Sequence, residues 1–94
     1  MSRPISSESK FRAIAHPTRR GIIDLLVRDE QTPNEMASHF KHSRPVFSKH
    51  LRVLEVAGLV SHERQKTQLV YRIVPGAFES LQQWISKLPR ASGR

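Results

Sequence analysis

The chain of 94 residues is predicted to form one domain that is mainly α with a small β-hairpin (α+β). Three observations predict this fold. Apolar residues recur at helical spacing along most of the chain, the period changes to 2 only between residues 59 and 74, and two short helical segments, the second of them basic, are separated by a short turn. The last pattern is typical of a helix-turn-helix. With the hairpin after it, the sequence predicts a winged helix-turn-helix.

Two helices are expected in the first third of the chain. Residues 7–15 (SESKFRAIA) form a short helix that presents Phe11 and Ile14 on one side, since residues three apart share a helix face. Pro17 is favoured in a first helical turn and begins the second helix. The apolar stripe of that second helix consists of Ile22, Ile23 and Leu26.

The third and fourth helices form the helix-turn-helix. Thr32 and Glu35 have the spacing of a capping box, in which the two side chains satisfy each other's backbone N–H groups. This helix ends by about Phe40, and Ser43 caps the next one. Residues 43–60 (SRPVFSKHLRVLEVAGLV) combine a basic side with an apolar stripe, as a recognition helix requires. The stripe is Phe47, Leu51, Leu54 and Gly58.

A hairpin and a final helix complete the domain. Residues 59–64 and 69–74 are the two strands, residues 65–68 form a polar tip, and Pro75 and Gly76 end the hairpin. The last helix runs from about Ala77 to Leu88. Its apolar side exceeds what so small a domain can bury, so we expect a partner subunit to cover part of it together with the first helix. The candidate dimer interface is Phe11, Ile14, Phe78, Leu81, Trp84, Ile85 and Leu88.

One domain is expected over residues 1–94, ordered from about 6 to 89 with frayed ends. The N-terminal residues contain no apolar run typical of a signal peptide, and no segment approaches the ~20 apolar residues of a membrane span. We therefore expect a cytoplasmic protein that does not associate with membranes. The absence of cysteine excludes disulfides and thiolate metal sites.

The charge of the chain indicates an anionic partner. Sixteen Lys and Arg against eight Asp and Glu leave a net charge of +8. Between Lys41 and Arg72, seven basic and two acidic residues give this third of the chain +5. Double-stranded DNA is the natural complement of such a patch, and a merely solubilising surface is the alternative.

The candidate DNA contacts lie on the recognition helix and the wing: Ser43, Arg44, Val46, Ser48, Lys49, His50, Arg52, Arg64 and Lys66. The alternative for the basic residues of the helix is a solvated face, and for Ser48 a bond back to its own helix. Val46 is either peripheral core or a contact to a thymine methyl group. His50 faces DNA or is a structural histidine. Arg64 and Lys66 touch phosphates or the minor groove unless the tip is disordered.

Four segments, residues 16–26 (HPTRRGIIDLL), 32–40, 43–60 and 69–73 (LVYRI), together resemble the ArsR-type winged helix-turn-helix repressors of bacteria, particularly the members that lack metal sites. The resemblance spans residues 8–88. It implies a homodimer built from the first and last helices, with paired recognition helices in successive major grooves. It also implies a repressor that covers a promoter.

The resemblance does not extend to the family's metal chemistry. Metal-sensing members carry thiolates on the helix before the recognition helix, where this chain has Thr32, Asn34 and Ala37. Others use histidines on the last helix, but none follows His62 here. His39 and His42 supply two imidazoles, which do not complete a site. We expect no cofactor and no response to metals, with release by a protein partner, a small organic ligand or a change in dimer concentration.

Two residues of the turn depart from the family pattern. The family often has Gly or Asn where Lys41 stands, because that residue tends to be left-handed, and a lysine there would cost on the order of 1 kcal/mol. An aliphatic residue is usual where His42 stands. These departures concern the geometry of the turn and not the fold.

The sequence thus predicts a sequence-specific transcriptional repressor that acts as a homodimer on an inverted-repeat operator. The alternative is a winged-helix protein-interaction module with an incidental basic face. No general acid-base pair, nucleophile-base arrangement or phosphate-binding loop supports an enzyme.

Overall fold

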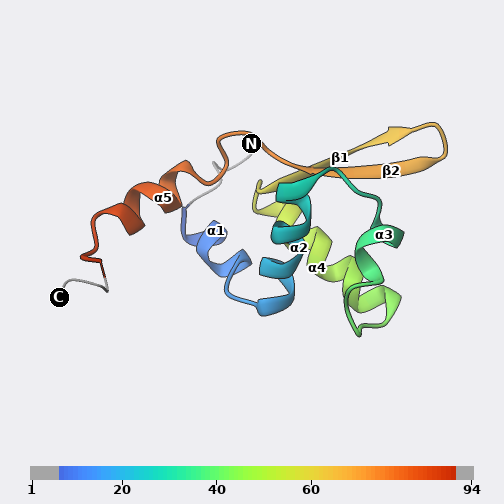
Figure 1. The fold of residues 1–94 in the computed structure, drawn as a ribbon, viewed down its shortest axis with the longest axis horizontal. Helices are drawn as coiled ribbons and strands as arrows, with labels where there is room; N and C mark the ends of the chain where they lie inside the picture. Colours follow the sequence, from blue (N-terminus) through green and yellow to red (C-terminus); the bar gives the residue numbers. More distant parts are fainter. Residues whose placement is uncertain (1–6, 91–94) are drawn as a thin grey trace, which may run out of the picture.

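The computed structural model describes residues 7–90, which form five α-helices and one antiparallel hairpin (Figure 1). The predicted winged helix-turn-helix is confirmed, while the expected frayed ends lie almost entirely outside the described residues. No helix among residues 7–90 is long and apolar enough to cross a membrane. The elements in chain order are α1 (Ser7–Ala13), α2 (Pro17–Arg28), α3 (Pro33–Ala37), α4 (Arg44–Val56), β1 (Val60–Gln65), β2 (Gln68–Ile73) and α5 (Glu79–Ser86).

The recognition helix α4 packs against α1, α2, α3 and β1, and α2 also contacts β2. Besides α4, helix α1 also contacts α5. Figure 1 shows α5 and the tip of the hairpin at opposite ends of the long axis, with α2 and α4 between them. The two candidate surfaces, one for DNA and one for a partner subunit, therefore lie on different parts of the molecule.

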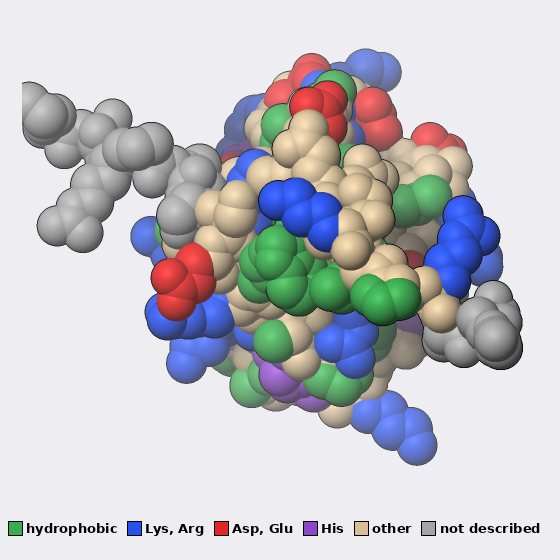
Figure 2. Space-filling model, turned by 90° about the vertical axis from the view of Figure 1, so that its left-hand side faces the viewer, with side chains coloured by type: hydrophobic (Ala, Val, Ile, Leu, Met, Phe, Trp, Pro, Cys, Tyr) green, Lys and Arg blue, Asp and Glu red, His purple; other side chains and the backbone are tan. Residues whose placement is uncertain are grey.

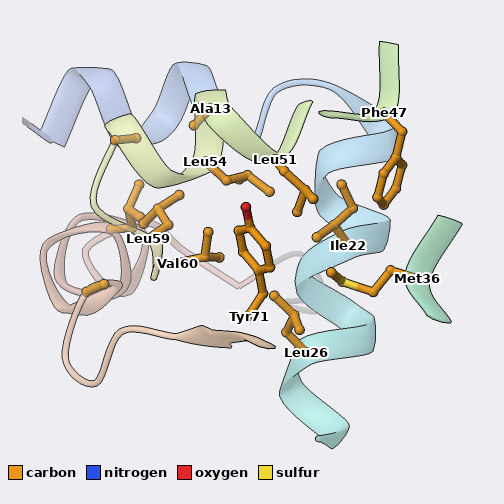
Figure 3. Close-up of a cluster of buried hydrophobic side chains, with 13 residues drawn as sticks. Ala13, Ile22, Leu26, Met36, Phe47, Leu51, Leu54, Leu59, Val60 and Tyr71 are labelled. Atoms are coloured by element: carbon orange, nitrogen blue, oxygen red, sulfur yellow. The ribbon is translucent and has the colours of Figure 1, made fainter. Parts of the chain in front are cut away.

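One hydrophobic core connects these elements. Tyr71 reaches from β2 into the space between Leu26 of α2 and Leu54 of α4 (Figure 3). Truncation of a large side chain in such a core to alanine lowers the free energy of unfolding by about 2–5 kcal/mol. The largest fully buried side chains are Phe47, Ile22, Met36, Leu54, Leu59 and Val60.

Three helices are shorter than expected. α1 ends at Ala13, and the guanidinium groups of Arg19 and Arg20 bond the carbonyl oxygens of Ala13 and Ile14 at 2.6 and 2.8 Å. α3 ends at Ala37 rather than near Phe40, with a turn over the following residues. α5 begins at Glu79 and ends at Ser86, and the turn that precedes it contains Gly76, with φ 77°.

The hairpin has a tighter tip than the expected four residues. Gln65 pairs with Gln68, which leaves Lys66 and Thr67 as a two-residue turn. Lys66 has φ 59°, in the left-handed region that few side chains adopt. The loop after α2 joins this sheet through Gln31, whose backbone exchanges two hydrogen bonds with Tyr71, at 2.8 and 3.2 Å. The base of the wing is thereby attached to the body of the domain.

Candidate DNA-binding interface

The first helix of the helix-turn-helix begins with the predicted capping box. The Thr32 hydroxyl accepts the Glu35 N–H at 3.2 Å, and the Glu35 carboxylate accepts the Thr32 N–H at 2.8 Å. Both donors belong to a helix start that has no backbone partner for them. The capping box thus determines where this five-residue helix begins.

The recognition helix α4 begins at the predicted Ser43 cap and is also held by a ring contact that the structure reveals. The Ser43 hydroxyl accepts the Val46 N–H at 3.4 Å, as an N-cap does. The rings of Phe40 and Phe47 lie 5.7 Å apart and join the turn to the helix. Ser43 therefore has a structural role in addition to the DNA contact predicted for it.

One side of α4 is free for a partner. Every predicted DNA contact on this helix except His50 is exposed, including the N-cap. Val46 is 42% exposed and is not part of the core, so of its two alternatives the peripheral-core position does not apply. This surface of α4, which we call the reading face, consists of Arg44, Val46, Ser48, Lys49 and Arg52.

His50 is a correction to the predicted set of DNA contacts. Its side chain is only 8% exposed, and its Nδ1 lies 3.3 Å from the Arg19 guanidinium. Burial and then the neighbouring charges, those of His16 first, lower its pKa below the ordinary value of 6.5. These surroundings fit the second of its two alternatives, in which His50 is a structural histidine and does not face DNA. Its spacing was the available signal, because it lies three residues after Phe47 and four before Leu54, on the apolar stripe.

The turn before α4 also differs from expectation. Among the described residues Lys66 alone of the non-glycine residues has a positive φ, so Lys41 does not adopt the left-handed conformation that was expected to strain it. His42 bonds through its Nε2 to the Thr18 hydroxyl at 2.9 Å. The turn is thus tied to the start of α2 by a polar contact at a position where an aliphatic residue is usual.

The wing carries fewer free positive charges than the sequence suggested. Arg64 and Lys66 are exposed and lie at or next to the tip. Arg72 instead pairs with the carboxylates of Glu63 and Glu30, and these hydrogen bonds raise its pKa. Arg72 therefore ties β2 to β1 and to the loop after α2, and is not part of a cationic surface.

The candidate dimer surface divides into a buried part and an exposed part. Leu81 is 2% exposed and belongs to the core of its own subunit, which corrects its assignment to an interface. Phe11, Ile14 and Phe78 are partly buried against that core. The exposed part consists of Trp84, Ile85 and Leu88, at 51, 52 and 48% exposure. Figure 2, which views the molecule from the end where α5 lies in Figure 1, shows hydrophobic side chains gathered at the centre of that face.

Phe11 and Trp84 join the two helices of this surface. Their rings meet edge to face with centroids 5.4 Å apart, and they line an apolar hollow together with Ser7 and Glu8. Sequence reasoning also missed two exposed apolar side chains, Val27 at 70% and Val56 at 67%, near the ends of α2 and α4. Single exposed valines are common on protein surfaces, so they define no site by themselves.

Metal ligands do not gather in the part of the chain that the structure describes. No three His, Asp or Glu side chains there are arranged to hold an ion. The ring of His42 is directed to Thr18 and lies 5.4 Å from the ring of His50. Histidines do meet in this region, but on the core side of the recognition helix.

The chain is similar to known DNA-binding regulators. Residues 14–63 match a family described as a helix-turn-helix domain. The transcriptional repressor SdpR of Bacillus subtilis (strain 168) is 44% identical over 61 residues, which cover 65% of this chain and 67% of SdpR.

Two solved structures share the fold over most of both chains. The ArsR family transcriptional regulator RHA00566 has a TM-score of 0.80 at 30% identity, covering 86% of this chain and 89% of that one. The homodimeric winged helix-turn-helix DNA-binding domain of Mb0332 from Mycobacterium bovis has a TM-score of 0.71 at 27% identity, covering 86 and 78%.

Proposed function

This chain belongs to the ArsR-type family of winged helix-turn-helix regulators, and on that premise we propose that it is a transcriptional repressor that binds operator DNA as a homodimer. The relatives are regulators of transcription and not enzymes. The observation that carries the proposal is the reading face, an exposed and mostly basic side of α4 whose opposite side is anchored in the core.

The reading face has the chemistry for both parts of DNA recognition. Arg44, Val46 and Ser48 occupy the first turns of α4, the part of a recognition helix that meets base edges in the major groove. Lys49 and Arg52 follow as phosphate contacts. Arg64 and Lys66 of the wing contact the DNA phosphates that flank the half-site or enter the adjacent minor groove. A salt-dependent affinity is the expected consequence.

A second copy of the chain covers the exposed apolar surface of α5. Trp84, Ile85 and Leu88 are each about half exposed, and Phe11 of α1 continues the surface. An apolar cluster of this kind on a regulator is best buried in a twofold interface. The domain of Mb0332 is described as homodimeric, which supports a dimer. The symmetry of the dimer then matches an inverted-repeat operator with half-sites one helical turn, roughly 34 Å, apart.

The repressor does not respond to metal ions. The chain has no cysteine, and the described histidines that lie near one another are bonded to Thr18 and Arg19 instead of facing a common point. Release from the operator then comes from a protein partner, a small organic ligand or a change in dimer concentration.

The proposal is tested by enriching duplexes from a random-sequence pool with the full chain and measuring the affinity of the enriched duplex across a salt series. A repressor of this kind selects an inverted repeat, and log K falls steeply with log salt. An unenriched pool, or weak binding that salt does not change, would favour a protein-interaction module instead.

A further inference from the structure

Arg19 connects three separate helices through one side chain. Its Nε donates to the carbonyl oxygen of Ala13 at 2.6 Å and its Nη2 to that of Arg12 at 3.3 Å, both at the end of α1. Its Nη1 lies 3.3 Å from Nδ1 of His50 on α4. Arg19 itself belongs to α2. A planar guanidinium with five fixed donors is suited to hold such an arrangement rigidly.

His50 is the part of this contact that belongs to the recognition helix. Because a guanidinium only donates, Nδ1 of His50 accepts the bond and carries no proton. The ring is buried, and the ring of His16, which caps α2, lies 4.5 Å away. The ring of His42 lies 5.4 Å away on the turn side, and Lys49 is the charged neighbour on the same helix. The middle of α4 is thus held by one polar contact, to Arg19, as well as by packing.

The same contact reaches toward the candidate dimer surface. α1, whose last carbonyl groups Arg19 holds, carries Phe11, and Phe11 meets Trp84 of α5 edge to face. A continuous series of contacts therefore runs from the exposed face of α5 through α1 and Arg19 to His50. In a twofold dimer, the position of each recognition helix relative to this face decides how far apart, and at what angle, the two helices lie.

We infer that Arg19 and His50 are a positioning pair, which sets the placement of the recognition helix relative to the dimer surface and thereby the half-site spacing that the protein accepts. This inference rests on the proposed function. Neither residue touches DNA; the pair acts through α4. Its removal therefore changes the preference for one spacing more than the affinity for a single half-site.

The test uses the full chain and the inverted-repeat duplex that the unaltered protein enriches from a random-sequence pool. The comparison duplexes carry the same two half-sites moved apart by one or two base pairs, and a further duplex carries a single half-site. Each added base pair rotates one half-site by about 35° around the DNA axis. Spacing preference is the ratio of the affinities for the enriched and the altered duplexes.

Four variants separate positioning from general stability. His50→Leu removes the hydrogen-bond acceptor and fills the buried position with an apolar side chain. His50→Asn instead places an amide oxygen, which can accept, near the position of Nδ1. Arg19→Gln removes the guanidinium from the other side. The matched control is Arg20→Gln, because Arg20 also holds the chain at the end of α1, through the Ile14 carbonyl at 2.8 Å, whereas the contact with His50 is made by Arg19.

Removal of the pair should weaken binding to the enriched duplex about tenfold and reduce the spacing preference, while half-site affinity stays within about twofold. This result is expected for His50→Leu and Arg19→Gln. His50→Asn should regain the preference, and Arg20→Gln should keep it. An unchanged preference, an equal reduction in Arg20→Gln, or equal weakening on every duplex would overturn the inference. If the unaltered protein enriches no duplex, the result contradicts the proposed function itself and not only the role of Arg19 and His50.

Discussion

Gly21 of α2 and Phe40, in the turn after α3, are so close that no methyl group fits between them. A Cβ atom on Gly21 would lie 2.8 Å from Cε1 and 3.1 Å from Cζ of the Phe40 ring. Phe40 in turn packs against Phe47 of the recognition helix, with ring centroids 5.7 Å apart. A missing side chain on α2 thus allows the helix-turn-helix to approach the body of the domain.

Gly21→Ala should therefore destabilise the protein although alanine is the better helix former. The helical gain is about 1 kcal/mol, and overpacking costs about 1–3 kcal/mol, so a net destabilisation of about 1 kcal/mol is expected. Urea unfolding at a fixed protein concentration measures the change. In a Phe40→Leu background the substitution should become stabilising. If Gly21→Ala alone raised the unfolding free energy, the close approach would have no energetic consequence.

Arg44 and Lys66 should affect DNA binding in different ways. Arg44→Ala, at the start of the reading face, should cost about 1–3 kcal/mol per half-site and reduce discrimination against random DNA. Lys66→Ala, at the tip of the wing, should weaken all sequences alike and lower the salt slope by about one unit for each phosphate that the lysine of either subunit no longer neutralises. Affinities for operator and random duplexes across a salt series measure both. The reverse pattern would make the wing the reader.

Ile85→Glu should convert the proposed dimer to a monomer. The side chain is 52% exposed in the isolated subunit, so its replacement leaves the core of that subunit intact while it places a charge in the interface. Sedimentation velocity at micromolar concentration measures the change. The control is Val27→Glu near the end of α2, where the valine is 70% exposed and belongs to neither of the two dimer helices. A monomeric unaltered protein would rule out the dimer.

Acidification should destabilise the fold through His50. Burial lowers the pKa of His50 below its unfolded value of 6.5, so the unfolded chain binds this proton more readily. The stability that neutral His50 provides is complete above pH 6.5 and is lost as the pH falls through the lower folded pKa. The slope contributed is at most roughly 1.4 kcal/mol per pH unit. Urea unfolding from pH 5 to 8 should show a shallower decline for His50→Asn; equal declines would contradict this role.

Zinc, cadmium or arsenite at one equivalent should leave operator affinity unchanged. The described residues provide no group of three ligands, and the chain has no thiol. Fluorescence anisotropy of a labelled operator, with and without chelator, measures the effect. Dissociation by one equivalent of metal and recovery with chelator would direct attention to His39 and His42.

Local features of this chain were predictable because they depend on neighbours in sequence. The capping box of Thr32 and Glu35, the Ser43 cap and the apolar stripe of α4 are short-range patterns, and all three appear as predicted. The change of period after Gly58 likewise predicted the hairpin. Such signals were sufficient to identify the order of elements and the exposed basic side of the recognition helix.

Tertiary structure decided which side chains are buried and which charges are paired. His50 and Leu81 lie on faces that sequence assigned to partners, but α2 and the core cover them. Arg72 counted as a free cation until Glu30, distant in sequence, was placed beside it. The helical period did place His50 on the apolar stripe of α4, but only the packing of α2 supplied Arg19 as its partner. Ion pairing likewise depends on which elements pack together, and the period of one segment does not contain that information. The sequence alone thus determined the fold and the reading helix, whereas the packing of α1, α2 and the wing determined how that helix is held.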